Sequence, residues 1–289
     1  ASLDRVNQIF ALESSMKETG KIAIIEEKKD APILEFKDTS FVYHGARKET
    51  IHPFDFAVKE GETIGVIGGT GSGKSTFVSL IARLYDVTSG RILYRGVDEK
   101  ELKPEFIRGK IGFVPQKASL FEGSLRDNMK WGKEDATDEE IYQALDIAQA
   151  REFVDQKEQG LDFRIEQNGG NLSGGQKQRL TIARALVRKP EILILDDSAS
   201  ALDFATDARL RKAIKENTDN MTVFLVSQRV STIRNADHIL VLDDGKIAGI
   251  GTHKELLRNC EFYKQIAASQ LSEKELQDGM QSEDRKTED

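Results

Sequence analysis

The chain has 289 residues, 38% of them hydrophobic and 31% charged, and its formal net charge is −7. This composition is typical of a soluble globular protein, with enough length for one large domain or two small ones. The negative balance gives no reason to expect nucleic acid as a partner. The single cysteine, Cys260, excludes an internal disulfide, so we expect a buried, inert thiol in a reducing compartment.

Residues 1–30 are expected to form a connector helix and a linker. Apolar residues recur there at the spacing of a short amphipathic helix: Leu3, Val6, Ile9 and Phe10. The charged stretch at 26–30 then interrupts the pattern. No apolar run approaches the roughly 18 residues of a membrane helix, and the first residues lack the pattern of a signal peptide. Membrane attachment is therefore expected only through a partner or through a segment outside this sequence.

Residues 31–268 predict an α/β domain. Its strand-length stretches are rich in β-branched and aromatic residues and include ILEFKDTSFVY, TIGVIG, RILYRGV, KIGFVP, EILILDD, TVFLVS and HILVLDDGKIAGIGT. Because the apolar strands lack strict alternation, they indicate a parallel sheet covered on both faces. Helical signals dominate from about 116 to 180, where Thr137 and Glu140 form a capping box, and indicate an inserted helical subdomain. The charged segment 269–289 has little to bury and is expected to be disordered.

The stretch TIGVIGGTGSGKSTFVSLIARL combines a strand, a glycine-rich turn and an apolar-periodic helix, and it matches G-x-x-x-x-G-K-[ST]. Glycines let backbone N–H groups surround phosphates, and the helix N-terminus adds its positive end. Lys74 would reach the β- and γ-phosphates, and the Ser75 hydroxyl would help to hold Mg²⁺. We therefore expect ATP to bind at nine consecutive residues: Gly68, Gly69, Thr70, Gly71, Ser72, Gly73, Lys74, Ser75 and Thr76.

A further metal ligand is predicted at Asp196. This aspartate follows the apolar strand ILIL, whose carboxyl end is expected beside the phosphate loop. An aspartate after a strand is, taken alone, more often a turn residue or a helix cap. The presence of a phosphate loop in the same chain reverses that preference.

Between these two elements lies NLSGGQKQRLTIARAL, a glycine-containing turn followed by a helix. Ser173, Gly174, Gly175 and Gln176 in this stretch resemble the signature sequence of the ATP-binding cassette (ABC) family. The amides at such a helix N-terminus are suited to face an anion. The resemblance covers roughly residues 33–265. It implies an α/β fold with a P-loop NTPase (RecA-like) core, an antiparallel β subdomain and an inserted helical subdomain, and it implies ATP hydrolysis.

The same resemblance gives roles to three more residues. Tyr43 resembles the aromatic residue that stacks on adenine, although a lone tyrosine is more often part of a core or a strand. Gln116 resembles the glutamine that contacts Mg²⁺ and moves with a transmembrane partner. Asp203, at the end of SALD, resembles part of the loop through which two cassettes communicate.

Within the family, RLYDVTSGRILYRGVD and PQKASLFEGSLRDN resemble the cassettes of exporters. The implied protein is a motor that works with the transmembrane domains of a multidrug exporter, at the cytoplasmic face of the cell (inner) membrane. The opening residues resemble the connector from the last membrane helix, so the chain is expected to be a piece of a longer half-transporter or a separate subunit. The alternatives are a regulatory ATP-binding module, an importer's ATPase subunit and a soluble ABC protein that acts on DNA or the ribosome.

Two residues depart from the family's usual pattern. Asp197 stands where a glutamate usually polarises the attacking water, and Gln228 stands where a histidine is usual. The aspartate carboxylate stops on the order of 1 Å short, which can cost about a hundredfold in rate. Gln228 can hydrogen-bond to a γ-phosphate but cannot carry a positive charge. We therefore expect Lys74, Asp197 and Gln228 to form a slow hydrolytic site that still binds nucleotide.

Cassettes of this family pair head to tail, so each ATP lies between one phosphate loop and the partner's signature sequence. The resemblance thus implies a second cassette, a different chain with a catalytic glutamate, whose faster site is completed by Ser173–Gln176 of this chain. A homodimer with two slow sites and a laboratory substitution at Asp197 or Gln228 are the alternatives. The exported substrate is not predicted, because the transmembrane domains would select it.

Overall fold

The computed structural model of the chain describes residues 7, 10, 16, 31–198, 201–218 and 220–281, without the side chains of 278–281. The predicted connector at 1–30 lies outside these residues, apart from Asn7, Phe10 and Met16. Residues 282–289 of the predicted disordered tail also lie outside them. No helix in the described ranges is long and apolar enough to cross a membrane.

The centre of the molecule is a six-stranded sheet with the order β12–β11–β3–β10–β9–β6. Its strands are β3 (Thr63–Gly68), β6 (Ile111–Val114), β9 (Ile192–Asp196), β10 (Thr222–Val226), β11 (His238–Asp243) and β12 (Lys246–Gly251). All neighbouring strands are parallel except β12, which forms an antiparallel hairpin with β11. The carboxyl ends of β3, β6, β9 and β10 therefore meet at one edge of the sheet.

Alternate residues of the central strands face two different cores. On β9, Ile192 and Ile194 belong to the core beneath the second sheet, whereas Leu193 and Leu195 belong to the core shared with the helical subdomain. A strand that is buried on both faces needs apolar residues at every position. This requirement explains the unbroken run ILIL, and it confirms the predicted parallel sheet with two covered faces.

A four-stranded antiparallel sheet with the order β2–β1–β4–β5 covers one of these cores. Its strands are β1 (Leu34–Phe41), β2 (Ile51–Val58), β4 (Ser89–Tyr94) and β5 (Val97–Asp98). Sequence analysis did not identify β2, which contains Pro53. Proline cannot donate to a ladder, and β2 accommodates it because β2 is an edge strand. The stretch RILYRGV, which resembled one strand, turns at Arg95 and Gly96 and divides between β4 and β5.

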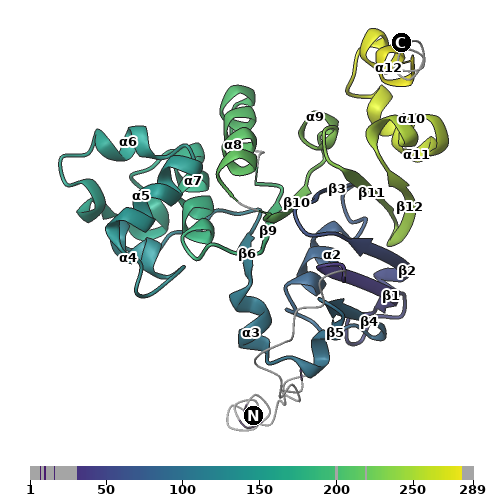
Figure 1. Ribbon diagram of the computed structural model, residues 1–289, viewed down its shortest axis with the longest axis horizontal. Coiled ribbons are helices and arrows are strands. Elements are labelled where there is room, and N and C mark those ends of the chain that lie inside the picture. The colour runs from purple at the N-terminus through teal and green to yellow at the C-terminus, as the bar shows by residue number, and fades with distance from the viewer. Residues whose placement is uncertain are drawn as a thin grey trace.

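The helical subdomain forms a separate lobe on the other side of the central sheet (Figure 1). It contains α4 (Leu125–Lys130), α5 (Asp138–Ile147), α6 (Arg151–Asp155), α7 (Gly174–Leu186) and the small sheet of β7 (Gly123–Ser124) and β8 (Arg164–Ile165). The capping box of Thr137 and Glu140 begins α5 as predicted. The last of these helices, α7, ends at Leu186, six residues beyond position 180, where the predicted subdomain ended.

The remaining helices surround the central sheet or follow it. They are α2 (Lys74–Ile81), α3 (Pro104–Gly109), α8 (Phe204–Asn217), α9 (Val230–Ile233), α10 (His253–Asn259), α11 (Glu261–Ala268) and α12 (Glu273–Gln281), with short 3₁₀ turns at Glu99–Glu101, Gly160–Asp162 and Gln167–Gly169. Cys260, between α10 and α11, is a buried free thiol, as expected.

The prediction of a disordered tail from residue 269 onward is wrong for α12. Ser272 accepts a hydrogen bond from the Glu275 backbone N–H, and the Glu275 carboxylate accepts from the Ser272 N–H at 3.1 Å. This reciprocal pair is a capping box, which starts a helix even in a charged segment. Leu276 then packs against the core, so this short segment has more apolar surface to bury than its composition indicates.

Candidate functional site

The predicted phosphate loop connects β3 to α2 and has a conformation that requires glycine. The backbone φ angle is 80° at Gly71 and 100° at Gly73, in a region that residues with a side chain rarely adopt. Gly68 is required for a different reason, because a Cβ atom there would lie 2.2 Å from the carbonyl oxygen of Leu242. The loop is therefore shaped both by its own turns and by close contact with β11.

The side chain of Lys74 lies inside this loop. Its ammonium donates to the carbonyl oxygens of Gly68 at 2.8 Å and Gly69 at 2.7 Å. Burial lowers the pKa of Lys74, while the charges of Asp197 and Asp196 act in the opposite direction and raise it. The two carboxylates thus favour the charged ammonium, and the loop presents a cation beside two acidic side chains.

The carboxyl edge of the sheet brings the predicted metal ligands together. Asp196 ends β9 and is buried. Burial raises the pKa of its carboxyl group above the usual value, and a hydrogen bond with the Ser75 side chain acts in the opposite direction. Gln116, two residues after β6, donates through Nε2 to Oδ2 of Asp197 at 3.1 Å. Residues that are far apart in the sequence, such as Ser75 and Asp196, therefore share one site.

These side chains suit a magnesium ion bound together with phosphate. Ser75, Asp196 and Gln116 offer a hydroxyl, a carboxylate and a carboxamide oxygen, which are the hard ligands that Mg²⁺ prefers. Within the residues that the structure describes, no group of three or more His, Cys, Asp or Glu side chains could hold a metal. A magnesium site that takes one or two carboxylates and completes its shell with phosphate and water needs no such group.

Asp197 and Gln228 follow neighbouring strands at this same edge. The Asp197 N–H donates to the Val226 carbonyl oxygen at 3.0 Å, and its φ of 46° is left-handed. Gln228 lies two residues after β10 and has an exposed side chain. The preceding residue, Ser227, is buried and donates its N–H to the Val66 carbonyl oxygen at 3.0 Å. The two departures from the family pattern thus lie on adjacent strands, next to the phosphate loop.

Tyr43 follows β1 and lies beside the start of α2. Its hydroxyl is 3.0 Å from the Thr76 hydroxyl, which follows Ser75 in the phosphate-loop helix. The ring meets those of Phe41 and Tyr85 edge to face, with centroid distances of 4.8 and 5.3 Å. The tyrosine is thus half-exposed next to the loop, although sequence alone favoured a core position.

The signature residues form a second, separate cluster at the start of α7. Ser173 accepts a hydrogen bond from the Gln176 N–H at 3.3 Å, and Gln176 Oε1 accepts from the Ser173 N–H at 3.0 Å. A Cβ atom on Gly174 would contact nothing within 4 Å, whereas one on Gly175 would lie 3.3 Å from the Ala201 carbonyl oxygen. Figure 1 shows α7 in the helical lobe, on the other side of β9 from α2.

Asp203 begins α8 close to this second cluster. Its carboxylate accepts hydrogen bonds from the Thr206 N–H at 2.9 Å and from the Thr206 hydroxyl at 2.8 Å. These bonds lower the pKa of Asp203. Its local role is therefore that of a helix cap.

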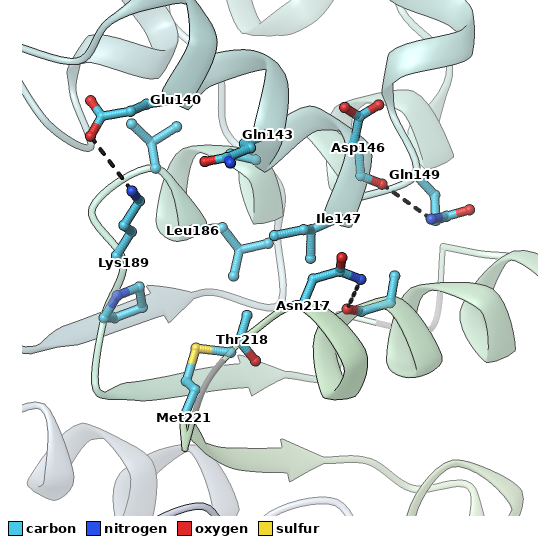
Figure 2. A pocket seen from close by; sticks show the side chains of 14 residues that line it. Glu140, Gln143, Asp146, Ile147, Gln149, Leu186, Lys189, Asn217, Thr218 and Met221 are labelled. Carbon is cyan, nitrogen blue, oxygen red and sulfur yellow. Dashed lines mark hydrogen bonds and ion pairs between the residues drawn. The ribbon is translucent and has the colours of Figure 1, made fainter.

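A cavity of about 590 Å³ lies between α5, the end of α7 and the end of α8 (Figure 2). Its lining includes Pro190 and Met221, which precede β9 and β10, and Lys189, which lies 3.8 Å from Glu140. The cavity is thus at the amino edge of the sheet, opposite the phosphate loop. It contains none of the predicted nucleotide-binding residues.

Two features near the site were not identified from sequence. Gln270, after α11, makes hydrogen bonds to the backbone on both sides of Arg229. A groove of about 290 Å³ is lined by Arg108, Trp131 and Arg184 among others. The exposure of Trp131 is a property of the fold that the sequence does not show, and the residues that line the groove come from separate segments of the chain. No local pattern in the sequence points to Gln270.

Comparison with known proteins places this geometry in a family. Residues 51–200 match the family model described as ABC transporter. The chain is 43% identical over 274 residues to the uncharacterized ABC transporter ATP-binding protein YfiB of Bacillus subtilis, which covers 94% of this chain and 46% of YfiB. It is 41% identical over 265 residues to the probable multidrug resistance ABC transporter ATP-binding/permease protein YheI of the same organism, covering 92% of this chain and 45% of YheI.

A solved structure agrees with these sequence relatives. The structure of a bacterial Atm1-family ABC exporter with ATP bound superimposes with a TM-score of 0.84 at 32% sequence identity, covering 94% of this chain and 48% of that one. The chain thus spans slightly less than half the length of these relatives. With the matched phosphate loop, signature sequence and two-sheet core, it belongs to the ABC transporter family and is a nucleotide-binding domain with the P-loop NTPase fold.

Proposed function

We propose that this chain is the ATP-hydrolysing motor domain of an ABC exporter and that its own phosphate-loop site cleaves ATP slowly. The observation that carries the proposal is the composition of the carboxyl edge of the sheet. The binding residues Lys74, Ser75 and Asp196 are complete, but the next residue is the short Asp197. Binding and cleavage depend on different side chains, and only the cleavage side chains depart from the family pattern.

Nucleotide binding would use the phosphate loop and its neighbours. The loop amides and the Lys74 ammonium bind the β- and γ-phosphates, while the Tyr43 ring, held beside Thr76, stacks on adenine. Ser75, Asp196 and Gln116 would hold Mg²⁺, which when bound neutralises charge on the β- and γ-phosphates. Each of these side chains lies at or beside the same edge of the sheet.

Cleavage would depend on Asp197 and Gln228. Asp197 accepts from Gln116 Nε2, which fixes the direction of its carboxylate, but the side chain is one methylene shorter than glutamate. A misplacement on the order of 1 Å costs about a hundredfold in rate. Gln228 offers a neutral hydrogen bond to the γ-phosphate, and loss of a charged transition-state contact costs about 3 kcal/mol. We therefore expect ATP to stay bound and uncleaved at this site for much longer than a site with the usual glutamate and histidine needs to cleave it.

A second cassette is the proposed partner. α7 lies in the helical lobe, away from α2, which supports the proposal that Ser173–Gln176 serve the phosphate loop of another chain. Head-to-tail pairing would put this signature sequence over a phosphate loop that carries a catalytic glutamate. We therefore favour a heterodimer with one slow and one fast site over a homodimer with two slow sites.

Transmembrane domains are the second proposed partner, and the groove beside Trp131 is suited to receive them. Trp131 is 68% exposed, and its ring is tilted by 33° against that of Phe121, at a centroid distance of 4.9 Å. In the same groove, Arg108 Nε and Arg184 Nη1 are buried and have no hydrogen-bond partner among the residues that the structure describes. Aromatic side chains next to arginine N–H groups that lack acceptors suit a partner segment whose carbonyl or carboxylate oxygens can accept these hydrogen bonds. The ATP-binding/permease relatives are about twice as long as this chain, which supports a membrane segment as the occupant at the cytoplasmic face of the membrane.

The proposal is tested by restoring the two side chains. Asp197→Glu combined with Gln228→His should raise single-turnover ATP cleavage at this site by about a hundredfold or more, since glutamate recovers the missing length and histidine can restore the charged contact. ATP affinity should change little, because the phosphate loop and Asp196 are intact and a histidine at 228 can still hydrogen-bond to the γ-phosphate. Radiolabelled ATP with protein in excess measures the cleavage rate, both for the chain alone and for the chain with its partner cassette.

Asp244→Glu provides a matched control. Asp244 also has a left-handed backbone, with a φ of 43°, but it lies in the turn between β11 and β12. It should therefore reproduce any effect of placing glutamate in this conformation, without changing cleavage. Unchanged turnover in the double variant would refute the account of the slow site. No cleavage even with the matching partner would favour a purely regulatory ATP-binding module.

A further inference from the structure

We propose that Gln270 is a positioning residue for Gln228, so that the C-terminal segment after α11 sets how this site senses the γ-phosphate. The inference rests on the proposed role of Gln228. The carboxamide of Gln270 donates through Nε2 to the Gln228 carbonyl oxygen at 2.8 Å, and its Oε1 accepts from the Val230 N–H at 2.8 Å. One side chain thus holds the backbone on both sides of Arg229.

The start of α9 depends on this contact. The residue at its N-cap, Arg229, makes no side-chain capping hydrogen bond. The N–H groups in the first turn of a helix have no partner within the helix, and a neighbouring side chain normally satisfies one of them. Here Gln270 supplies that acceptor from 40 residues further along the chain.

Gln228 is consequently held between two anchors. On the upstream side, the Ser227 N–H donates to the Val66 carbonyl oxygen of β3 at 3.0 Å, and the Ser227 hydroxyl accepts from the Arg229 N–H at 3.0 Å. On the downstream side, Gln270 holds the carbonyl group of Gln228 itself. With the backbone fixed at both sides, the direction of the Gln228 side chain is limited to its own rotamers.

The segment that carries Gln270 is itself fixed to the domain. The Leu271 N–H donates to the Ala267 carbonyl oxygen at 2.8 Å, and Leu271 packs against the core. Glu275, in the capping box of α12, lies 3.3 Å from Arg234 at the other end of α9. An exposed ion pair of this kind adds little energy, but it joins the start of α12 to the end of α9. Gln270 and Glu275, which we call the C-terminal clasp, therefore contact α9 at both ends.

This arrangement predicts a selective defect when the clasp is opened. Without Gln270 the Gln228 backbone gains freedom, and the hydrogen bond from Gln228 to the γ-phosphate weakens. ADP lacks a γ-phosphate, so its binding should not change. The contacts made by Gln270 are to backbone atoms, so the clasp should act in the same way when residue 228 is histidine.

The test measures ATP and ADP affinity by calorimetry on the full chain with Mg²⁺. Gln270→Ala should lower ATP affinity about threefold to tenfold, the range of one net hydrogen bond, and leave ADP affinity unchanged. Gln265→Ala is the matched control, since Gln265 is an exposed glutamine on the preceding helix, α11, and should change neither affinity. In a Gln228→Ala background, Gln270→Ala should have no further effect on ATP binding.

Amide hydrogen exchange at Val230 provides a readout that does not depend on nucleotide. Gln270→Ala should accelerate this exchange about tenfold. Gln270→Glu should keep Val230 protected, because a carboxylate still accepts the N–H, but should lose ATP selectivity, because it cannot donate to the Gln228 carbonyl. Gln265→Ala should leave the exchange unchanged.

The outcomes separate the two proposals. If Gln228→Ala itself leaves the ratio of ATP to ADP affinity unchanged, the assigned role of Gln228 is wrong. If Gln228→Ala lowers the ratio but Gln270→Ala does not, the positioning role of Gln270 is wrong. Equal losses for ATP and ADP in Gln270→Ala would mean that Gln270 only stabilises the fold. Unchanged Val230 exchange would show that the clasp does not hold α9.

Discussion

The aspartate at position 197 affects both the hydrolytic chemistry of the site and the backbone conformation after β9. Its φ of 46° lies in the left-handed region, where aspartate is found more often than most residues with a side chain. The short side chain thus suits this turn and limits the reach toward a water molecule. Asp197→Glu is accordingly expected to gain cleavage and to lose a little stability. Asp244→Glu is expected to lose a little stability in the same way, without any gain in ATP cleavage.

Asp196 leads to a prediction about pH. Burial is the main cause of its raised pKa, so its carboxylate takes up a proton at a higher pH than an exposed aspartate does. A protonated Asp196 cannot hold Mg²⁺. The affinity for Mg-ATP should therefore fall as the pH drops through this raised pKa, and calorimetry at a series of pH values from neutral down to the ordinary aspartate range should follow the loss.

Asp196→Asn is the decisive variant for that prediction. A raised folded-state pKa means that the charged carboxylate destabilises the fold, and that this cost develops as the pH rises from the unfolded to the folded pKa. The neutral amide avoids the cost, so the nucleotide-free variant should melt at a higher temperature than the wild type at neutral pH. It should also bind ATP without a Mg²⁺ dependence. Wild-type affinity for Mg-ATP in Asp196→Asn would exclude a metal-binding role.

At the scale of elements, two helix-capping boxes show what could be predicted from local sequence patterns. The box of Thr137 and Glu140 was recognised and begins α5, whereas the equivalent pair of Ser272 and Glu275 was overlooked because its surroundings are highly charged. Both depend on residues three positions apart, so both were available in the sequence. By contrast, Gln116 with Asp197 and Gln270 with Gln228 are joined across 81 and 42 residues. Such pairs follow from the packing of strands and helices, and no local pattern contains them.

The two capping boxes that begin α5 and α7 allow a structural effect to be separated from a functional one. Ser173→Ala and Thr137→Ala each remove an N-cap hydroxyl, so each should cost about 1 kcal/mol, or about 2–4 °C in melting temperature. Only Ser173 is proposed to face the partner's nucleotide. ATP turnover by the pair should therefore fall about tenfold or more in Ser173→Ala and stay near wild type in Thr137→Ala. Equal losses of turnover in the two variants would contradict the head-to-tail assignment.

At the scale of the whole molecule, β6 connects the groove beside Trp131 with the nucleotide site. Ile111, Gly112 and Phe113 of β6 line the groove, and Gln116, two residues after the strand, donates to Asp197. The groove also includes residues of α7 and the end of α4, so an occupant would contact both the core and the helical subdomain. A docked membrane segment could thus move Gln116 and the start of α7 together. Sequence analysis predicted a transmembrane partner by resemblance, but the groove forms only when segments that are distant in the sequence come together in the fold.

Trp131→Ala tests this connection. Loss of a central interface tryptophan typically costs about 2 kcal/mol or more of binding free energy. Binding of the chain to vesicles that contain the transmembrane domains should weaken by about thirtyfold, while ATP affinity of the chain alone stays unchanged. Ile250→Ala, which truncates an exposed apolar residue on β12, is the control and should bind the vesicles normally.

Because the groove ends at β6, vesicles should also alter the ATP turnover of the wild-type chain and its partner, and Trp131→Ala should abolish that response. Normal vesicle binding by Trp131→Ala would exclude the groove as the docking site, whereas weakened binding with an intact response of turnover would exclude β6 as the connection.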